Sequence, residues 1–443
     1  MKRLLKLFSG DGVKATLTRG AVGSFVVQCS GAVIALVLFL VLARVLGPEA
    51  YGDYMIVFSW VQLLGIVAAL GIDSSLVRYI PQYLATQDWR AFRGLLWWST
   101  KTTLLLGCVV SILVALVAWY FREHFRPELV HTWWAGAVVL PLLLYGNMNQ
   151  AALCGLGAVV TSLSLGQNLR PSLLLCAVGG YVLFLDATPT SQGVMFFNAA
   201  GAVITLTAGL VCLRKHLPKP GDEGLEIHSR EWLGVSTQLL LLSGSYLILN
   251  RTDTLMLGAI RGTTDAGIYF TASRIATLTL FGLWAVNVIA APMISRLYTE
   301  KRLADLQTMV LHSFWGLAAF SIPVASLLAT LGGYLLGLFG DQFQSGHTAL
   351  AILSVGHLVN ALSGPVGALL TMTGHQKDHL WIVGCAAAFN VILNAVLIPF
   401  LGMTGAALGT AVTTILSNIT LCLVVLKRVN IHTTPVAKIL GRL

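Results

Sequence analysis

The sequence predicts an all-α membrane protein that crosses the bilayer about twelve times, in two lobes of six helices each. Of its 443 residues, 56% are hydrophobic and 10% are charged, whereas soluble domains carry about 25% charged residues. The apolar runs are long enough to cross a bilayer and lack the alternation of strands. Such runs cross as helices, because lipid cannot satisfy free backbone polar groups. The most polar interruption, HLPKPGDEGLEIHSREW at 216–232, separates two equal sets of runs.

The expected spans are bounded by turn residues and charges, and glycines within them suit close helix packing in a bilayer. In chain order they cover about 20–46, 53–74, 94–121, 130–154, 160–185, 192–213, 232–258, 266–292, 306–330, 347–373, 378–400 and 405–426. Gly405 and Gly409 form one small-xxx-small pair of the kind that brings helices together. The seven cysteines lie in apolar segments without CxxC spacing, and we expect free thiols in the helix cores.

The basic residues predict the orientation. With both termini in the cytoplasm, 20 of the 28 Lys and Arg residues fall in inside loops. Only Arg44, Arg122, Arg126 and Arg261 fall outside. This asymmetry follows the positive-inside rule, and it explains the net charge of +10 without a nucleic-acid partner. We therefore expect a multi-pass protein of the bacterial cytoplasmic (inner) membrane.

The expected domains are an N-terminal lobe over 1–215, a cytoplasmic linker over 216–231 and a C-terminal lobe over 232–443. A shift of 215 residues brings four residues of the first lobe onto identical residues of the second: Gly47 onto Gly262, Gly52 onto Gly267, Tyr54 onto Tyr269 and Tyr83 onto Tyr298. Since six spans return the chain to the same side, the lobes are expected to be parallel repeats, as in alternating-access transporters.

Three segments resemble one known family. LARVLGPEAYGDYMIVFSWVQLLGIVAALGIDSSLVRYIPQY (42–83) is similar to the opening signature of bacterial polysaccharide-export flippases in the multidrug/oligosaccharidyl-lipid/polysaccharide exporter superfamily. NRTDTLMLGAIRGTTDAGIYFTASRI (250–275) resembles the start of their second lobe, and TGHQKDHLWIVGCAAAFNVILNAVLIPFLGMTGAALGTAV (373–412) their closing segment. The resemblance implies two six-helix lobes around a central cavity and transport of lipid-linked oligosaccharides.

In the first lobe, Arg170 and Gln167 are the expected substrate-binding residues. Their segment, TSLSLGQNLRPSLLLC, lies in mid-span, and Pro171 cannot donate a hydrogen bond to the carbonyl of Gln167. Gln167 and Arg170 are three residues apart and share a helix face. Irregular backbone at this depth is tolerated where it lines a cavity or packs in protein. The alternative is that Arg170 pairs with a carbonyl or an acid and holds the lobe together.

In the second lobe, Arg251, Arg274 and Asp253 place charges in apolar sequence, where each costs roughly 2.5–3.5 kcal/mol. Arg251 and Asp253 are two residues apart and do not face each other on a helix. Asp253 shares a face with Asn250, and the two are candidates for a coupling ion, H⁺ or Na⁺. Arg251 and Arg274 are expected to bind substrate, the latter also because the resembling family carries an arginine in this context. The alternatives are that Asp253 neutralises an arginine and that Arg274 snorkels to the outer interface.

Other charged positions have a structural alternative as well. Lys101 is a further candidate for substrate binding, although a lysine two turns from the cytoplasmic end can snorkel. Arg44 and Arg78 flank the first spans and are expected to set topology, and Asp73 is expected to pair across helices. His312 and His357 are candidates for proton coupling, but a lone histidine in an apolar span is more often a packing residue.

The charge balance selects the class of function. The span interiors hold four basic residues, Lys101, Arg170, Arg251 and Arg274, against about two acids, and arginine suits bidentate contact with phosphate. We therefore expect a flippase, not an enzyme, for a polyprenyl-pyrophosphate-linked oligosaccharide, working by alternating access among membrane lipids. A multidrug or cation antiporter, a lipid II flippase and a membrane glycosyltransferase or polymerase are the alternatives. The chain has no Walker A, HExxH or GxSxG motif, so no cofactor is expected. A polysaccharide polymerase is a candidate partner.

Overall fold

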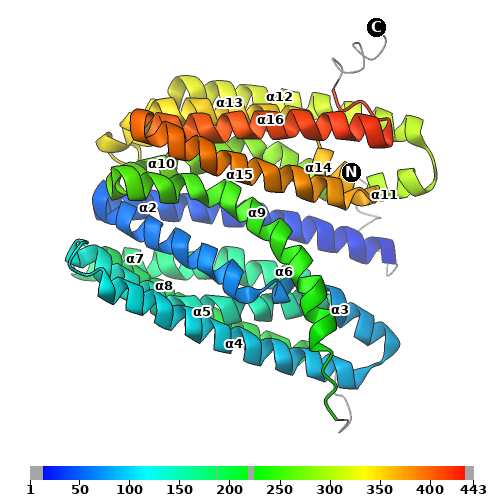
Figure 1. Cartoon of the computed structure of the whole chain (residues 1–443), viewed down its shortest axis with the longest axis horizontal. Coiled ribbons are helices and arrows are strands. Elements are labelled where there is room, and N and C mark those ends of the chain that lie inside the picture. Colours follow the sequence, from blue (N-terminus) through cyan, green and yellow to red (C-terminus); the bar gives the residue numbers. More distant parts are fainter. Residues whose placement is uncertain (1–12, 186, 218–223, 435–443) are drawn as a thin grey trace. The chain divides into compact units, whose positions relative to one another are not determined.

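The computed structural model describes residues 13–185, 187–217 and 224–434, and every regular element in these ranges is a helix (Figure 1). The elements before the chain midpoint are α2 (Val13–Ala69), α3 (Ile72–Thr86), α4 (Trp89–Tyr120), α5 (Pro127–Gly155), α6 (Val159–Leu163), the π-helix η1 (Ser164–Leu169), α7 (Arg170–Leu185) and α8 (Ser191–His216). The remaining elements are α9 (Ser229–Arg261), α10 (Thr263–Ala276), η2 (Thr277–Leu280), α11 (Phe281–Thr299), α12 (Leu303–Gly337), η3 (Asp341–Gly346), α13 (His347–Ser363), α14 (Val366–Met372), α15 (Gln376–Leu401) and α16 (Met403–Val429).

The helices confirm an all-α polytopic membrane protein. Eight helices in the described ranges are long and apolar enough to cross a membrane, and a bent pair, 341–363 with 366–372, makes a ninth. The first of these, Val26–Ala69, contains two expected spans, because α2 runs through a kink at Gly47. Two further expected spans correspond to α6–η1–α7, which a π-helix interrupts, and to α9. The twelve expected segments are thus all helical.

Two expected spans are less regular than the sequence suggested. The span over 347–373 bends by 41° between α13 and α14, because Gly364 takes a φ of 74° and Pro365 follows it. The span over 266–292 contains the short 3₁₀ turn η2. At each break, backbone N–H and C=O groups do not form the regular i to i−4 hydrogen bonds of an α-helix.

The chain forms two compact units, Met1–Gly244 and Ser245–Leu443. The division falls within α9, so its first turns pack with the first unit. The expected lobes over 1–215 and 232–443 with a linker over 216–231 remain a prediction, since 218–223 lie outside the described residues, as do Lys2, Arg3, Lys6, Lys219, Lys438 and Arg442.

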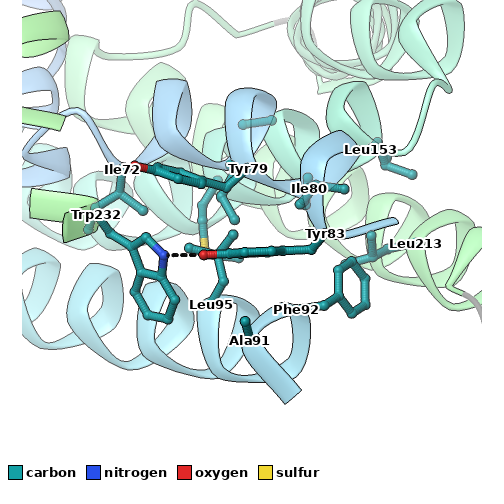
Figure 2. Packing of buried hydrophobic residues seen from close by; sticks show 14 of the residues in the cluster. Ile72, Tyr79, Ile80, Tyr83, Ala91, Phe92, Leu95, Leu153, Leu213 and Trp232 are labelled. Carbon is teal, nitrogen blue, oxygen red and sulfur yellow. Dashed lines mark hydrogen bonds between the residues drawn. The ribbon is translucent and has the colours of Figure 1, made fainter. Parts of the chain in front are cut away.

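An aromatic cluster holds the start of α9 in the first unit (Figure 2). Trp232 is fully buried, and its indole N–H donates to the hydroxyl of Tyr83 at 2.9 Å. The Ser75 and Ser236 hydroxyls lie 2.7 Å apart beside it. Gly71, with a φ of 72°, permits this approach, since a Cβ there would lie 2.2 Å from the carbonyl oxygen of Ser236. The helix that leads into the second unit is therefore fixed against α3.

The segment directly before α9 lies along α4. The amide of Glu226 donates to the carbonyl of Arg90 at 3.2 Å. Gly94 of α4 faces the same segment, and a Cβ there would lie only 1.8 Å from the carbonyl oxygen of Glu226. The absence of a side chain at Gly94 thus allows the extended segment to lie directly on the helix.

At the opposite end of the first unit, ion pairs hold the kink of α2. Arg126, at the start of α5, pairs with Glu49 and, at 2.8 Å, with Asp53. The Asp53 side chain is nearly inaccessible, so the pair anchors the second half of α2 against α5. Residue 126 is one of the few arginines expected outside, and here it has a structural role.

In the second unit, α11, α12, α14 and α16 share an apolar core, and small residues bring α15 and α16 together. A Cβ on Gly405 would lie 2.4 Å from the carbonyl oxygen of Leu397, and one on Gly409 would lie 2.6 Å from the side-chain oxygen of Asn394. The small-xxx-small pair therefore faces α15 as the sequence predicted.

The seven cysteines are free thiols, as expected. The expectation that all lie in the helix cores is wrong for four of them, Cys29, Cys108, Cys176 and Cys385, which are exposed. A thiol is apolar enough for a lipid-facing surface, so hydropathy does not distinguish the two positions.

We expect Gly94→Ala to destabilise the protein, because its methyl group would overlap the Glu226 carbonyl. Overpacking of this kind costs about 1–3 kcal/mol, to be measured as a lower midpoint of thermal unfolding of the purified protein. Gly179→Ala is the matched control, since Gly179 also lies in a helix and has no neighbour within 4 Å of its added Cβ. Equal midpoints for the two variants would show that the linker is not held on α4.

Candidate functional site

The first unit holds Arg170 directly after a π-helix. The six residues Ser164–Leu169 form wider turns, and Arg170 and Pro171 begin α7. The expected break is thus present, and it extends over the residues before the proline. A Cβ on Gly31 of α2 would lie 3.0 Å from the carbonyl oxygen of Gln167, so this backbone faces α2 at close range. π-Helical turns of this kind occur frequently at functional sites.

Polar contacts from α2 and α5 hold the π-helix and the short helix α6 before it. The Asn168 amide donates to the Ser30 hydroxyl at 2.8 Å, and its oxygen is buried without a hydrogen-bond partner among the described residues. On the other side, the Ser162 hydroxyl donates to the carbonyl of Gln150 at 2.7 Å. The irregular backbone is therefore packed in protein and keeps one free acceptor.

Arg170 lies over an aromatic ring. Its guanidinium carbon is 5.9 Å from the ring centroid of Phe58, and Phe58 stacks on Tyr54 at 5.8 Å. The hydroxyl of buried Tyr54 accepts a hydrogen bond from Asn198 at 3.0 Å. Within the described ranges no acid forms an ion pair with Arg170. Gln167, the other residue predicted here, is exposed.

The second unit brings two predicted arginines to one ring. The guanidinium carbon of Arg251, on α9, lies 5.5 Å from the ring centroid of Phe270, and that of Arg274, on α10, lies 5.0 Å from the same centroid. The ring face is electron-rich and attracts both cations. The two arginines also repel each other. The turn at Gly262 between α9 and α10 creates this pairing of residues 23 positions apart.

The charge of Arg251 is not fully compensated. Its side chain is 8% exposed, and Nη1 has no hydrogen-bond partner among the described residues. A buried donor without a partner costs about 1–3 kcal/mol, and more when it is charged. An anion between the two arginines would supply the acceptor and reduce their repulsion.

Asp253, two residues from Arg251, is held by different neighbours. Its Oδ2 accepts hydrogen bonds from the Tyr269 hydroxyl at 2.6 Å and from the Thr410 hydroxyl at 3.2 Å, and its Oδ1 accepts the Thr254 amide at 2.7 Å. These donors come from α9, α10 and α16. The carboxylate is thus satisfied mainly by hydroxyl groups, in agreement with the expectation that Arg251 and Asp253 do not form a private pair.

Side-chain amides extend this network into α15. Asn390 donates to the Thr410 hydroxyl at 3.4 Å, and Asn394 donates to Asn390 at 3.0 Å. The Asn394 oxygen is buried without a hydrogen-bond partner among the described residues. One carboxylate and several neutral oxygens therefore lie together in an apolar bundle. The described ranges hold no cluster of three or more His, Cys, Asp or Glu side chains that would bind a metal.

The remaining candidates lie apart from these sites. Asn250 is exposed on α9, in contrast to buried Asp253. Lys101 is exposed, with its ammonium 4.1 Å from the ring centroid of Trp97. His312 bonds the Thr308 carbonyl one turn away on an exposed face, whereas His357 is partly buried and its buried Nδ1 has no partner in the described part.

Five residues belong to these sites although sequence patterns did not predict them: Tyr269, Thr410, Asn390, Tyr54 and Asn198. One signal for them was present: Tyr54 and Tyr269 are the tyrosines of the repeated Gly-x-Tyr segments. Each tyrosine lies seven residues after a turn glycine, Gly47 or Gly262. The two glycines adopt similar conformations, with φ and ψ of 71° and 169° at Gly47 and of 102° and 171° at Gly262. Each unit thus turns at a glycine and buries the same tyrosine, beside Arg170 in one and Asp253 in the other.

Two family models match the chain. The model described as polysaccharide biosynthesis protein matches residues 17–298, which is more than half of the chain. The model named MatE matches residues 240–396.

Curated relatives of full length are also similar. The probable low-salt glycan biosynthesis flippase Agl15 from Haloferax volcanii is 20% identical over 398 residues, covering 89% of this chain and 80% of the relative. The probable flippase AglR from the same organism is 23% identical over 419 residues, covering 91% and 82%.

Solved structures share the fold. An inward-facing multidrug resistance MATE family transporter of the MOP superfamily aligns with a TM-score of 0.73 at 16% identity, covering 93% of this chain and 98% of the transporter. A MOP superfamily transporter from Pyrococcus furiosus, described as having a binding pocket of reverse polarity, aligns with a TM-score of 0.62 at 16% identity, covering 96% and 98%. At this identity the similarity establishes the architecture alone.

We expect Arg251→Met to raise the midpoint of thermal unfolding in the absence of added anions. The change removes a buried unpaired donor and the repulsion with Arg274, about 1–3 kcal/mol, and similar exchanges of buried charges for apolar groups are often stabilising. Arg261→Met, at the exposed end of the same helix, should leave the midpoint unchanged. A lower midpoint for Arg251→Met alone would show that Arg251 has a structural role.

Proposed function

Because the chain belongs to the polysaccharide biosynthesis protein family and has the fold of MOP superfamily transporters, we propose that it flips a polyprenyl-pyrophosphate-linked oligosaccharide across the cytoplasmic membrane. The observation that carries this proposal is the pair of arginines at Phe270, one with a buried N–H that lacks a partner. The similarity to a probable glycan biosynthesis flippase supports the same class of substrate, and the similarity to a second probable flippase supports the same activity.

A pyrophosphate would supply the acceptor that the buried N–H of Arg251 lacks among the described residues. It presents several oxygens on two phosphorus atoms, and arginine binds such groups through two parallel hydrogen bonds. Arginine also keeps its charge in an apolar environment better than lysine does. We propose that Arg251 and Arg274 bind the pyrophosphate, that Arg170 and Gln167 bind it or the first sugars in the other lobe, and that the polyprenyl tail stays in lipid.

The geometry argues against an organic cation as substrate. A cation antiporter needs an acidic side chain that is open to its cargo. Asp253, the acid within the second-unit site, already accepts hydrogen bonds from Tyr269, Thr410 and Thr254. The Pyrococcus furiosus transporter, whose binding pocket of reverse polarity is described as suggesting a different function, is a precedent for this fold with another pocket polarity.

We propose alternating access without catalysis. The two lobes would rock so that the basic groups face each side of the membrane in turn, with both chain termini in the cytoplasm, as the distribution of basic residues predicts. A sugar polymerase that consumes the flipped product is the partner that this chemistry favours. The matched proteins are named as flippases and transporters, which favours transport over glycosyl transfer.

We further propose that Asp253 binds the coupling ion, H⁺ or Na⁺. The carboxylate lies in a network of hydroxyl and amide oxygens from Thr410, Asn390 and Asn394, and oxygen atoms are the preferred ligands of hard cations. Asn250 is the second residue predicted for this role. It is exposed on α9, so it would reach the ion only after a conformational change of this helix.

Replacing Arg274 or Arg170 by Gln is expected to reduce flipping at least tenfold, since each loses charge-assisted contacts of about 1.5–3 kcal/mol. The measurement uses proteoliposomes with a defined polyprenyl-pyrophosphate oligosaccharide and follows the exposure of the sugar to an added glycosidase. Arg→Lys at the same positions should retain part of the rate.

The matched control is Arg261→Gln, which removes an exposed arginine of α9 and should flip at the wild-type rate. Protein yield and thermal midpoint are measured for every variant. Wild-type flipping in both the Arg274 and the Arg170 variants would refute the assignment of these residues to the substrate.

Asp253→Asn is expected to uncouple flipping from the ion gradient. In wild-type proteoliposomes, an imposed H⁺ or Na⁺ gradient should change the flipping rate, and in the variant the rate should be independent of both gradients, because the neutral amide cannot exchange an ion. Tyr269→Phe, which removes one hydrogen bond but keeps the carboxylate, should remain gradient-sensitive. A gradient response of the Asn variant equal to wild type would exclude Asp253 as the ion site.

A further inference from the structure

A pocket of about 350 Å³ opens in the first unit beside the N-terminal half of α4, in a region that the proposed transport mechanism does not use. It is bordered by Trp97 and Lys101 of α4, Tyr145 and Asn149 of α5 and Leu217 after α8. These three helices lie side by side, with α5 packed on both α4 and α8 (Figure 1). The volume is at the lower end of the range for ligand pockets, about 300–1,000 Å³.

One polar side chain in the lining has no partner. Asn149 is 1% exposed, and both its amide nitrogen and its oxygen lack hydrogen-bond partners among the described residues. Burying an amide without hydrogen bonds costs about 1–3 kcal/mol on the scale of protein mutations. A ligand with polar oxygens above an apolar chain would satisfy this side chain.

A cation lies at the edge of the same pocket. The Lys101 ammonium lies 4.1 Å from the ring centroid of Trp97, one helical turn earlier on α4. The side chain is therefore directed toward the helix end that is predicted to be cytoplasmic. The last turn of α8 adds Arg214 and Lys215 next to the lining residues Leu213 and Leu217. The positive charge of Lys101 at the mouth of the pocket favours an anion.

The surface that continues from the mouth is apolar. Beyond Lys101, α4 contains no charged residue, and Leu105, Ile112, Leu113 and Leu116 are more than half exposed. Exposed side chains of this kind are typical of a helix that faces lipid. Lys101 lies seven residues into the expected span and Asn149 five residues from the end of another, or about 10 and 8 Å from the interface at 1.5 Å per residue. This depth corresponds to the region directly below lipid headgroups.

We propose that this pocket binds one anionic phospholipid of the cytoplasmic leaflet. Lys101 would contact the phosphate, the Asn149 amide would donate to an ester carbonyl, and one acyl chain would fill the apolar part near Tyr145 and Leu217. The site is independent of the transported substrate, and its loss would leave Arg251, Phe270 and Arg274 intact.

The test is native mass spectrometry of the full-length protein in detergent, titrated with phosphatidylglycerol or with phosphatidylcholine of the same acyl chains. The wild type should bind one phosphatidylglycerol more tightly than phosphatidylcholine. Lys101→Gln should weaken phosphatidylglycerol binding roughly tenfold, the value of a charge-assisted contact, and abolish the preference. Leu217→Trp, which fills the pocket, should weaken the binding of both lipids.

Lys377→Gln is the charge-matched control, since Lys377 is exposed on the second unit. Unchanged lipid preference in Lys101→Gln, or an equal loss in Lys377→Gln, would overturn the proposal. Displacement of phosphatidylglycerol by inorganic phosphate would identify a simple anion site instead. Tighter binding of a polyprenyl phosphate at the same position would assign the pocket to the transported lipid, and it would also overturn the phospholipid assignment.

Discussion

A buried guanidinium N–H of Arg251 that has no acceptor among the described residues is the constraint on which the second unit depends. In hydrocarbon surroundings a charge costs several kcal/mol unless it is paired, yet the guanidinium groups of Arg251 and Arg274 lie at one phenylalanine ring and repel each other. The ring offsets part of this cost through its electron-rich faces. The part of this cost that the ring does not offset favours the binding of an anion. A transporter uses a site that binds and releases an anion in turn, whereas a purely structural site would hold its partner permanently.

The two units contain the same glycine turn and buried tyrosine, but the tyrosine has different polar neighbours in each. In each, a glycine with positive φ is followed by a buried tyrosine. In the first unit, Tyr54 stacks on the ring beneath Arg170, next to a π-helix with exposed Gln167. In the second, Tyr269 donates to Asp253. The repeat thus conserves the turn and the buried ring, while the polar neighbour differs.

Hydropathy and charge were sufficient to predict the helices, the break before Pro171 and the arginines that lie in apolar surroundings. They could not predict which arginines meet, because Arg251 and Arg274 come together only through the turn at Gly262 and the shared ring of Phe270. The Asp253 network was also hidden, since Tyr269 and Thr410 are 16 and 157 residues away and an apolar span tolerates single hydroxyl groups. Local patterns predict segments, whereas the sites depend on contacts between segments.

The position of Asp253, two residues from Arg251, provides a physical mechanism for the proposed coupling between ion binding and substrate binding. The two residues are two positions apart on one rigid helix but face different neighbours, the carboxylate toward hydroxyl groups and the guanidinium toward Phe270. An ion that neutralises Asp253 removes the negative charge nearest to Arg251, so the arginine attracts an anionic headgroup more strongly. By linkage, the bound headgroup increases the affinity of Asp253 for the ion by the same factor. A single helix would then connect ion binding to substrate binding without any long-range pathway.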